Sequence, residues 1–108
     1  MDTKNVELCN SLEEVRCNID KIDIELIGLI AARSYYVNQA AHFKKSENEI
    51  LASDRVDIII NKVKELGKEK GLSPFVTEKI FRTMIKVFID EELAEFNPVY
   101  KEIRRSYY

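Results

Sequence analysis

Glycine, proline and histidine are scarce in this chain of 108 residues. It contains three Gly, two Pro, one His and no Trp. A fold of many short strands needs frequent turns, and turns depend on Gly and Pro, so their scarcity argues against an all-β protein. Lys, Glu, Leu and Ile are plentiful, and Lys, Glu and Leu in particular favour helices. The composition therefore predicts an all-α fold.

The small number of cysteines and histidines also restricts the chemistry that we expect. Cys9 and Cys17 are accompanied by no further Cys or His at ligand spacing, so we predict neither a zinc site nor a disulfide framework. We interpret both as reduced thiols. His42 has no Ser or Cys nucleophile motif around it, and the chain has no Gly-rich phosphate loop. We expect no metal and no cofactor.

Neither a basic stripe nor a long apolar run is present. The formal net charge of −2 is spread along the chain, which argues against a nucleic-acid partner. No apolar run approaches the roughly 18 residues of a membrane span, and the polar N-terminus MDTKNVELCNS lacks the apolar core of a signal peptide. We therefore expect a cytoplasmic protein with no membrane partner.

The length of the chain suits one domain. With 45% hydrophobic and 33% charged residues, 108 residues can bury a modest core, but they do not suffice for two domains. We place the helical core at residues 12–96. We expect the N-terminus and the tail at residues 97–108 to be flexible.

The first apolar stripe predicts an unusually long helix. Ser11 and Glu14 form a capping box at its start, and apolar residues then recur every three or four positions. No proline interrupts the pattern before Pro74. We predict a helix from Leu12 to about Lys44.

Two shorter helices are predicted to follow. Ser53 supplies a second start signal, and the helix ends near Gly71, which suits a left-handed stop. Ser73 and Pro74 form an N-cap followed by a first helical residue, and this third helix ends near Asn97. The polar stretch FKKSENEILASDRV, residues 43–56, would connect the first two helices.

The first predicted helix is too long to be covered by the other two. About 33 residues at 1.5 Å each give roughly 50 Å, whereas a compact domain of this size has a radius of gyration near 13 Å. The remaining apolar stripe can be buried against a second copy of the chain. We therefore predict a homodimer whose long helices pack together.

Charged residues occupy positions where these stripes should be apolar. Long cationic side chains can reach water from an apolar face, and this remains the simpler explanation for any one of them. A guanidinium deep inside a helix, such as that of Arg33, needs an anionic partner to offset its desolvation. Because one carboxylate cannot neutralise four cations, the pattern suggests a site for a small dicarboxylate. The residues are Arg16, Arg33, Lys44, Arg55 and Glu92.

Together these residues resemble the AroQ-type chorismate mutase family over roughly residues 12–96. Each motif is weak alone, but their order and separations are specific. Within that family, the stretch at residues 43–56 is most similar to the isochorismate pyruvate lyase branch. The resemblance implies an intertwined all-α homodimer without a cofactor. The motifs are LEEVRCNIDKID with Arg16, AARSYYV with Arg33, FKKSE with Lys44, ASDRV with Arg55 and FIDEEL with Glu92.

The resemblance also implies a role for each charged residue. Arg33, Lys44 and Arg55 would come from one protomer, and Arg16 would reach in from the other. Arg16 and Arg33 would hold the two substrate carboxylates. Lys44 and Glu92 would be the catalytic residues and would face the ether oxygen of the breaking bond. The stretch at residues 43–56 would form a polar lid with Lys44 and Arg55 at its ends.

Three further residues complete the expected substrate-binding set. Ala52 and Val56 stand where bacterial mutases generally have carboxylates, and their apolar character resembles the lyase. Phe88 lies four residues before Glu92 on the same stripe. Glu92 replaces the Gln that is usual in bacterial members and resembles the fungal mutases, so neither branch is matched in full.

Three functions therefore remain open. Our first expectation is a chorismate mutase that converts chorismate to prephenate without a cofactor, because that is the commonest role of the family. An isochorismate pyruvate lyase, which forms salicylate and pyruvate, is the close alternative. A non-catalytic helical dimer that binds a dicarboxylate is the third.

Overall fold

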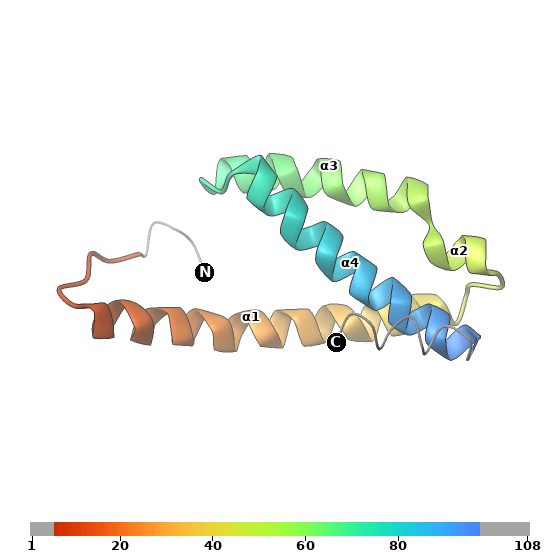
Figure 1. Ribbon diagram of the computed structural model, residues 1–108, viewed down its shortest axis with the longest axis horizontal. Helices are drawn as coiled ribbons and strands as arrows, with labels where there is room; N and C mark the ends of the chain where they lie inside the picture. The colour runs from red at the N-terminus through yellow and green to blue at the C-terminus, as the bar shows by residue number, and fades with distance from the viewer. Residues whose placement is uncertain (1–5, 98–108) are drawn as a thin grey trace. The chain divides into compact units, whose positions relative to one another are not determined.

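The computed structural model describes residues 6–97, and within that range all the regular structure is helical (Figure 1). Three long helices confirm the predicted all-α fold. A short fourth helix lies in the stretch that we expected to be a polar connection. The expected flexible tail falls almost entirely outside the described residues. The helices are α1 (Leu12–Ala41), α2 (Glu47–Leu51), α3 (Ser53–Glu69) and α4 (Pro74–Phe96).

The chain divides into two units, Met1–Val37 and Asn38–Tyr108. The first contains most of α1, and the second contains the end of α1 together with α2, α3 and α4. None of the helices between residues 6 and 97 combines the length and hydropathy that crossing a membrane requires.

The start of α1 is the predicted capping box. The backbone N–H of Glu14 donates to Ser11 Oγ at 3.1 Å, and the Glu14 carboxylate accepts from the backbone N–H of Asn10 at 2.8 Å. The Glu14 N–H, one of the backbone donors that a helix start leaves unpaired, is thereby satisfied, and the second bond ties the residue before the cap to the first turn.

The end of α1 comes three residues earlier than predicted, at Ala41. The N–H groups of His42, Phe43 and Lys44 donate to carbonyls three residues back rather than four, so the last turn tightens and stops. Lys44 therefore lies in the turn after α1. The prediction that the first helix extends to Lys44 is wrong.

The apolar stripe of α1 is solvent-accessible in the single chain. No residue of α1 is buried. The side chains of the stripe are between 37% and 69% exposed, and they are Leu12, Val15, Ile19, Ile22, Leu26 and Leu29. Within the described residues of the first unit, α1 therefore carries an exposed hydrophobic surface.

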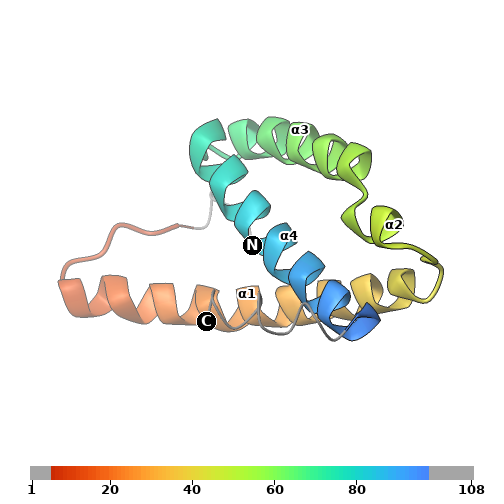
Figure 2. The ribbon, with the colours of Figure 1, turned by 45° about the vertical axis from the view of Figure 1, so that its right-hand side comes forward.

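In the second unit, α3 and α4 form a helical hairpin (Figures 1 and 2). Ile60 of α3 and Ile85 of α4 are buried. A Cβ atom at Gly67 would collide with the side chain of Thr77, which is itself buried. Glycine at position 67 therefore lets the two helices approach closely near their connection.

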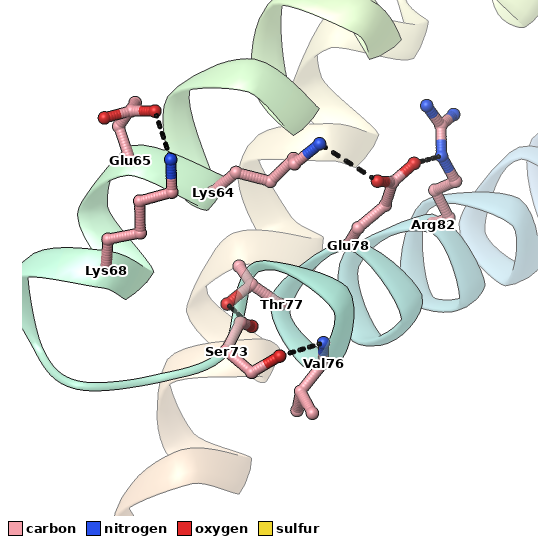
Figure 3. Close-up of polar contacts among 8 residues, drawn as sticks. All are labelled: Lys64, Glu65, Lys68, Ser73, Val76, Thr77, Glu78 and Arg82. Atoms are coloured by element: carbon pink, nitrogen blue, oxygen red, sulfur yellow. Dashed lines mark hydrogen bonds and ion pairs between the residues drawn. The ribbon is translucent and has the colours of Figure 1, made fainter.

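The turn between α3 and α4 follows the prediction. Gly71 has a positive φ of 81°, a conformation that glycine adopts without steric cost. Ser73 Oγ then accepts from the backbone N–H of Val76 at 3.4 Å (Figure 3). Pro74 occupies the first helical position. The chain therefore reverses direction through two local signals that are visible in the sequence.

A charged cluster joins α3 to α4 on the surface (Figure 3). Lys64 Nζ lies 3.3 Å from Glu78 Oε1, and Arg82 Nε lies 2.7 Å from Glu78 Oε2. Hydrogen bonds from Arg82 and then Lys64 lower the pKa of Glu78 below its ordinary value. Because these side chains are partly exposed, the cluster contributes only modestly to stability.

The short helix α2 begins at the N-cap Ser46 and packs against α4. Ile50 is its buried residue. Ala52 alone separates α2 from α3, and it adopts a left-handed conformation with φ 41° and ψ 49°. Ser53, which we expected to cap α3, is instead its first helical residue, since Ala52 occupies the cap position without a side-chain bond.

Candidate active site

Lys44 and Glu92 meet although 48 residues separate them in the sequence. Lys44 Nζ lies 3.1 Å from Glu92 Oε2 and 3.3 Å from Oε1. Lys44 comes from the turn after α1, and Glu92 comes from the last turns of α4. The structure therefore brings together the two residues that were expected to be catalytic.

The environment of this pair is partly closed to solvent. Glu92 is 7% exposed and Lys44 is 23% exposed, and the neighbours Leu93 and Ala94 on α4 are buried. A carboxylate in such surroundings requires a cationic partner to offset its desolvation. Lys44 supplies that partner, and the ammonium has three N–H donors. It can therefore bind Glu92 and donate to one further acceptor.

The start of α3 carries three of the expected binding residues. Ala52 is half-buried in its left-handed conformation, Arg55 is exposed in the first turn of α3, and Val56 is half-buried beside it. Lys44 precedes α2 and Ala52 follows it, so this short helix links the two groups of candidates. Phe88, also half-buried, lies one turn before Glu92 on α4.

Arg16 and Arg33 belong to the first unit. Arg16 is exposed and Arg33 is half-buried, both on α1. They are 17 residues apart on one helix, which corresponds to roughly 25 Å along its axis at 1.5 Å per residue. A small dicarboxylate does not span that length, so two arginines of the same α1 are poorly placed to hold one such ligand.

The remaining sequence candidates lie elsewhere. His42 is exposed in the turn after α1. Cys9 and Cys17 are free thiols, and both line a small pocket at the start of α1 that contains none of the candidate site residues. Within residues 6–97, no three His, Cys, Asp or Glu side chains are grouped as a metal site would require.

One contact near the site was not predicted from the sequence. The carboxylate of Glu49 accepts a hydrogen bond from the backbone N–H of Lys45, the residue after Lys44. The backbone N–H of Glu49 in turn donates to Ser46 Oγ at 3.2 Å. The signal was present as the capping-box pattern SENE at residues 46–49, but we interpreted that stretch as a polar connection and lid, without a helix.

Comparison with known proteins shows the family of the chain. Residues 15–93 match the family described as chorismate mutase type II. The chain is also 35% identical over 91 residues to the isochorismate pyruvate lyase of Pseudomonas aeruginosa. The aligned region covers 83% of this chain and 89% of that protein. The residues that match the family include Lys44 and Glu92. The chain is therefore an enzyme of the chorismate mutase type II family.

Proposed function

We propose that this protein acts on isochorismate and eliminates pyruvate to leave salicylate. The contact between Lys44 and Glu92 is the observation that carries the proposal, because it places an ammonium donor in a partly desolvated site. The apolar residues Ala52 and Val56 favour this activity over the mutase. The similarity to the Pseudomonas aeruginosa isochorismate pyruvate lyase also favours it.

The elimination requires no nucleophile. The ether bond between the ring and the enolpyruvyl group breaks while a ring hydrogen moves to the enolpyruvyl methylene carbon, so the atoms of isochorismate divide completely between salicylate and pyruvate. Negative charge grows on the ether oxygen as the bond breaks. Lys44 would stabilise that charge with an N–H group that Glu92 does not occupy, as a preorganised donor does.

Glu92 would act in two ways. As a carboxylate it holds the Lys44 ammonium, which is the geometry described above. When it carries a proton it can also donate a hydrogen bond to the ether oxygen. Arg33 and Arg55 of the same chain would hold a carboxylate and the enolpyruvyl arm, so that the reacting atoms are aligned.

The same proposal includes a homodimer with Arg16 contributed by the second copy. The uncovered apolar stripe of α1 supplies a surface for packing. The separation of Arg16 and Arg33 along α1 is the second argument. The two arginines of one chain are too far apart to bind the same small ligand, whereas Arg16 of a second copy could approach the ligand that Arg33 binds.

Chorismate mutase is the second candidate, and it was our first expectation from the sequence. The family match favours it. Lys44 and Glu92 would again face the ether oxygen, because the rearrangement of chorismate to prephenate breaks the equivalent bond. We now rank the lyase activity before the mutase activity, because Ala52 and Val56 offer no carboxylates near the ring hydroxyl. The similarity to the lyase is the second reason.

Supplying the two substrates separately tests the proposal. We expect purified protein to form salicylate and pyruvate in equal amounts from isochorismate, with faster turnover than any conversion of chorismate to prephenate. Chromatography would identify the products. Prephenate as the main product would favour the mutase, and binding of both compounds without turnover would favour a non-catalytic dicarboxylate-binding dimer.

A further inference from the structure

We propose that Glu49 is a positioning residue that fixes the direction in which Lys44 leaves the backbone. The catalytic part of this inference rests on the proposed function, because Lys44 is the ether-oxygen donor there. Its structural part concerns only the ligand-free chain. Glu49 itself would touch no substrate, since its carboxylate is engaged by the backbone of Lys45.

The peptide groups on both sides of Lys44 are held by hydrogen bonds. The N–H of Lys44 donates to the carbonyl of Ala41 at 3.1 Å, which fixes the peptide that precedes the Lys44 Cα atom. The N–H of Lys45 donates to Glu49, which fixes the peptide that follows it. Because each peptide is planar, holding both planes restricts φ and ψ of Lys44 together.

This restriction matters because Lys44 lies outside any helix. A lysine within a helix receives its direction from the helical backbone, whereas Lys44 is in the turn between α1 and α2. Its long side chain loses considerable rotamer freedom when it is held in place. A fixed Cα–Cβ direction reduces the number of side-chain conformations that Lys44 can adopt. Less conformational entropy is then lost when Nζ is placed beside the ether oxygen.

Glu49 is itself anchored to the helix that carries Glu92. It lies in α2 next to Ile50, which is 3% exposed, and α2 packs against α4. Ser46 Oγ accepts the backbone N–H of Glu49 and completes the capping box. The backbone of Lys44 and its Nζ atom are thus both held in relation to α4, one through Glu49 and the other through Glu92.

Three variants of the full-length protein separate positioning from simple helix capping. Glu49→Ala removes the contact to Lys45. Glu49→Gln keeps a side-chain oxygen that can accept the same N–H and should restore the contact. Ser46→Ala is the matched control, since it removes the other half of the capping box while Ile50 still packs α2, and with it Glu49, against α4.

The first measurement uses no substrate and follows the Lys45 amide and the Lys44 side-chain ammonium by nuclear magnetic resonance. In Glu49→Ala we expect faster hydrogen exchange at the Lys45 amide and a shifted Lys44 ammonium signal. In Glu49→Gln and in Ser46→Ala, the exchange rate of the Lys45 amide and the Lys44 ammonium signal should stay close to those of the wild type. An unchanged Lys44 signal in Glu49→Ala would overturn the positioning role, whatever the protein catalyses.

The second measurement compares kcat and KM for isochorismate in the same variants. We expect Glu49→Ala to lower kcat about tenfold with a smaller change in KM, because misplacement of a catalytic group acts on the reacting geometry. Glu49→Gln should recover most of kcat, and Ser46→Ala should lose less than Glu49→Ala. Equal kcat in wild type and Glu49→Ala would reject the catalytic part of the inference. An inactive wild type would instead reject the proposed function, and the first measurement would still decide the structural part.

Discussion

The carboxylate of Glu92 is almost entirely buried, and its described partner is Lys44. This pairing changes what the loss of either side chain should do. A buried carboxylate without its cation is costly, so Lys44 contributes to stability as well as to the proposed chemistry. Two predictions follow from the geometry of this pair.

Lys44→Ala should lower both turnover and stability. We expect a loss in kcat of at least about a hundredfold, as for removal of a preorganised donor, and a decrease in the free energy of unfolding of about 1 to 3 kcal/mol because Glu92 loses its partner. Adding Glu92→Gln to this variant should recover part of the stability without recovering turnover. Urea unfolding and steady-state kinetics measure the two effects. Wild-type turnover in Lys44→Ala would remove this residue from the mechanism.

Glu92→Gln and Glu92→Ala test the second role of Glu92. A glutamine amide can accept from Lys44 Nζ and can also donate to the ether oxygen, whereas alanine can do neither. We expect Glu92→Gln to keep at least about ten times the kcat of Glu92→Ala. Steady-state kinetics of both variants provides the test. Equal kcat in the two variants would show that neither contact of Glu92 contributes to turnover.

At the scale of helices, local signals and tertiary contacts act on different parts of the chain. The starts of α1 and α4 and the left-handed stop after α3 follow from short patterns around Ser11, Ser73 and Gly71. The position of α4 against α3 depends in addition on Gly67 and Thr77, which come together only when the hairpin forms. The Lys64, Glu78 and Arg82 cluster crosses the same hairpin.

The lowered pKa of Glu78 predicts a pH-dependent contribution to stability. Its folded-state pKa lies below the ordinary value of 4.5 because Arg82 and Lys64 donate hydrogen bonds to it. The contribution is therefore complete above the ordinary value and is lost as the pH falls through the lower folded-state value.

We expect Glu78→Gln to reduce the change in unfolding free energy across that acid range, and the effect should be small because the cluster is partly exposed. Thermal unfolding of both proteins at a series of pH values measures it. A parallel pH dependence in both proteins would contradict a role for this cluster.

At the scale of the whole molecule, the uncovered face of α1 and the arginines on it lead to the proposed dimer. If Arg16 serves the site of the partner, chains carrying Arg16→Ala and chains carrying Lys44→Ala should each form inactive homodimers. A mixed dimer would hold one complete site, with Lys44 from one chain and Arg16 from the other. After random exchange of subunits, about a quarter of wild-type activity should return.

The control is exchange between chains that both carry Lys44→Ala, which should restore nothing. Sedimentation would establish that dimers form and exchange. Absence of recovery in fully exchanged mixtures would mean that Arg16 acts within its own chain or takes no part. A monomer at all concentrations would reject the dimer itself.

Much of the site could be predicted from the sequence because helical periodicity reveals charges on apolar faces. Lys44 and Glu92 were selected in this way, and the structure brings them into contact. The short helix α2 was missed because its five residues are too few to show a period, although the capping pattern at Ser46 and Glu49 marked its start. The expectation that Lys44 ends α1 was also wrong, since helix ends depend on the turn that follows.

The sequence by itself determined the all-α class and the three long helices, because capping and periodicity are local properties of the chain. Periodicity also placed Lys44 and Glu92 among the charges on apolar stripes, and the resemblance to a known family made them the candidate catalytic pair. The tertiary structure alone decided that Lys44 lies in a turn and that the peptide groups on both sides of it are hydrogen-bonded. It also decided that Glu92 is buried and paired with Lys44. It further decided that Ala52 joins α2 to α3 in a left-handed conformation. The physical reason is that contacts between residues far apart in the sequence depend on how α2 packs on α4.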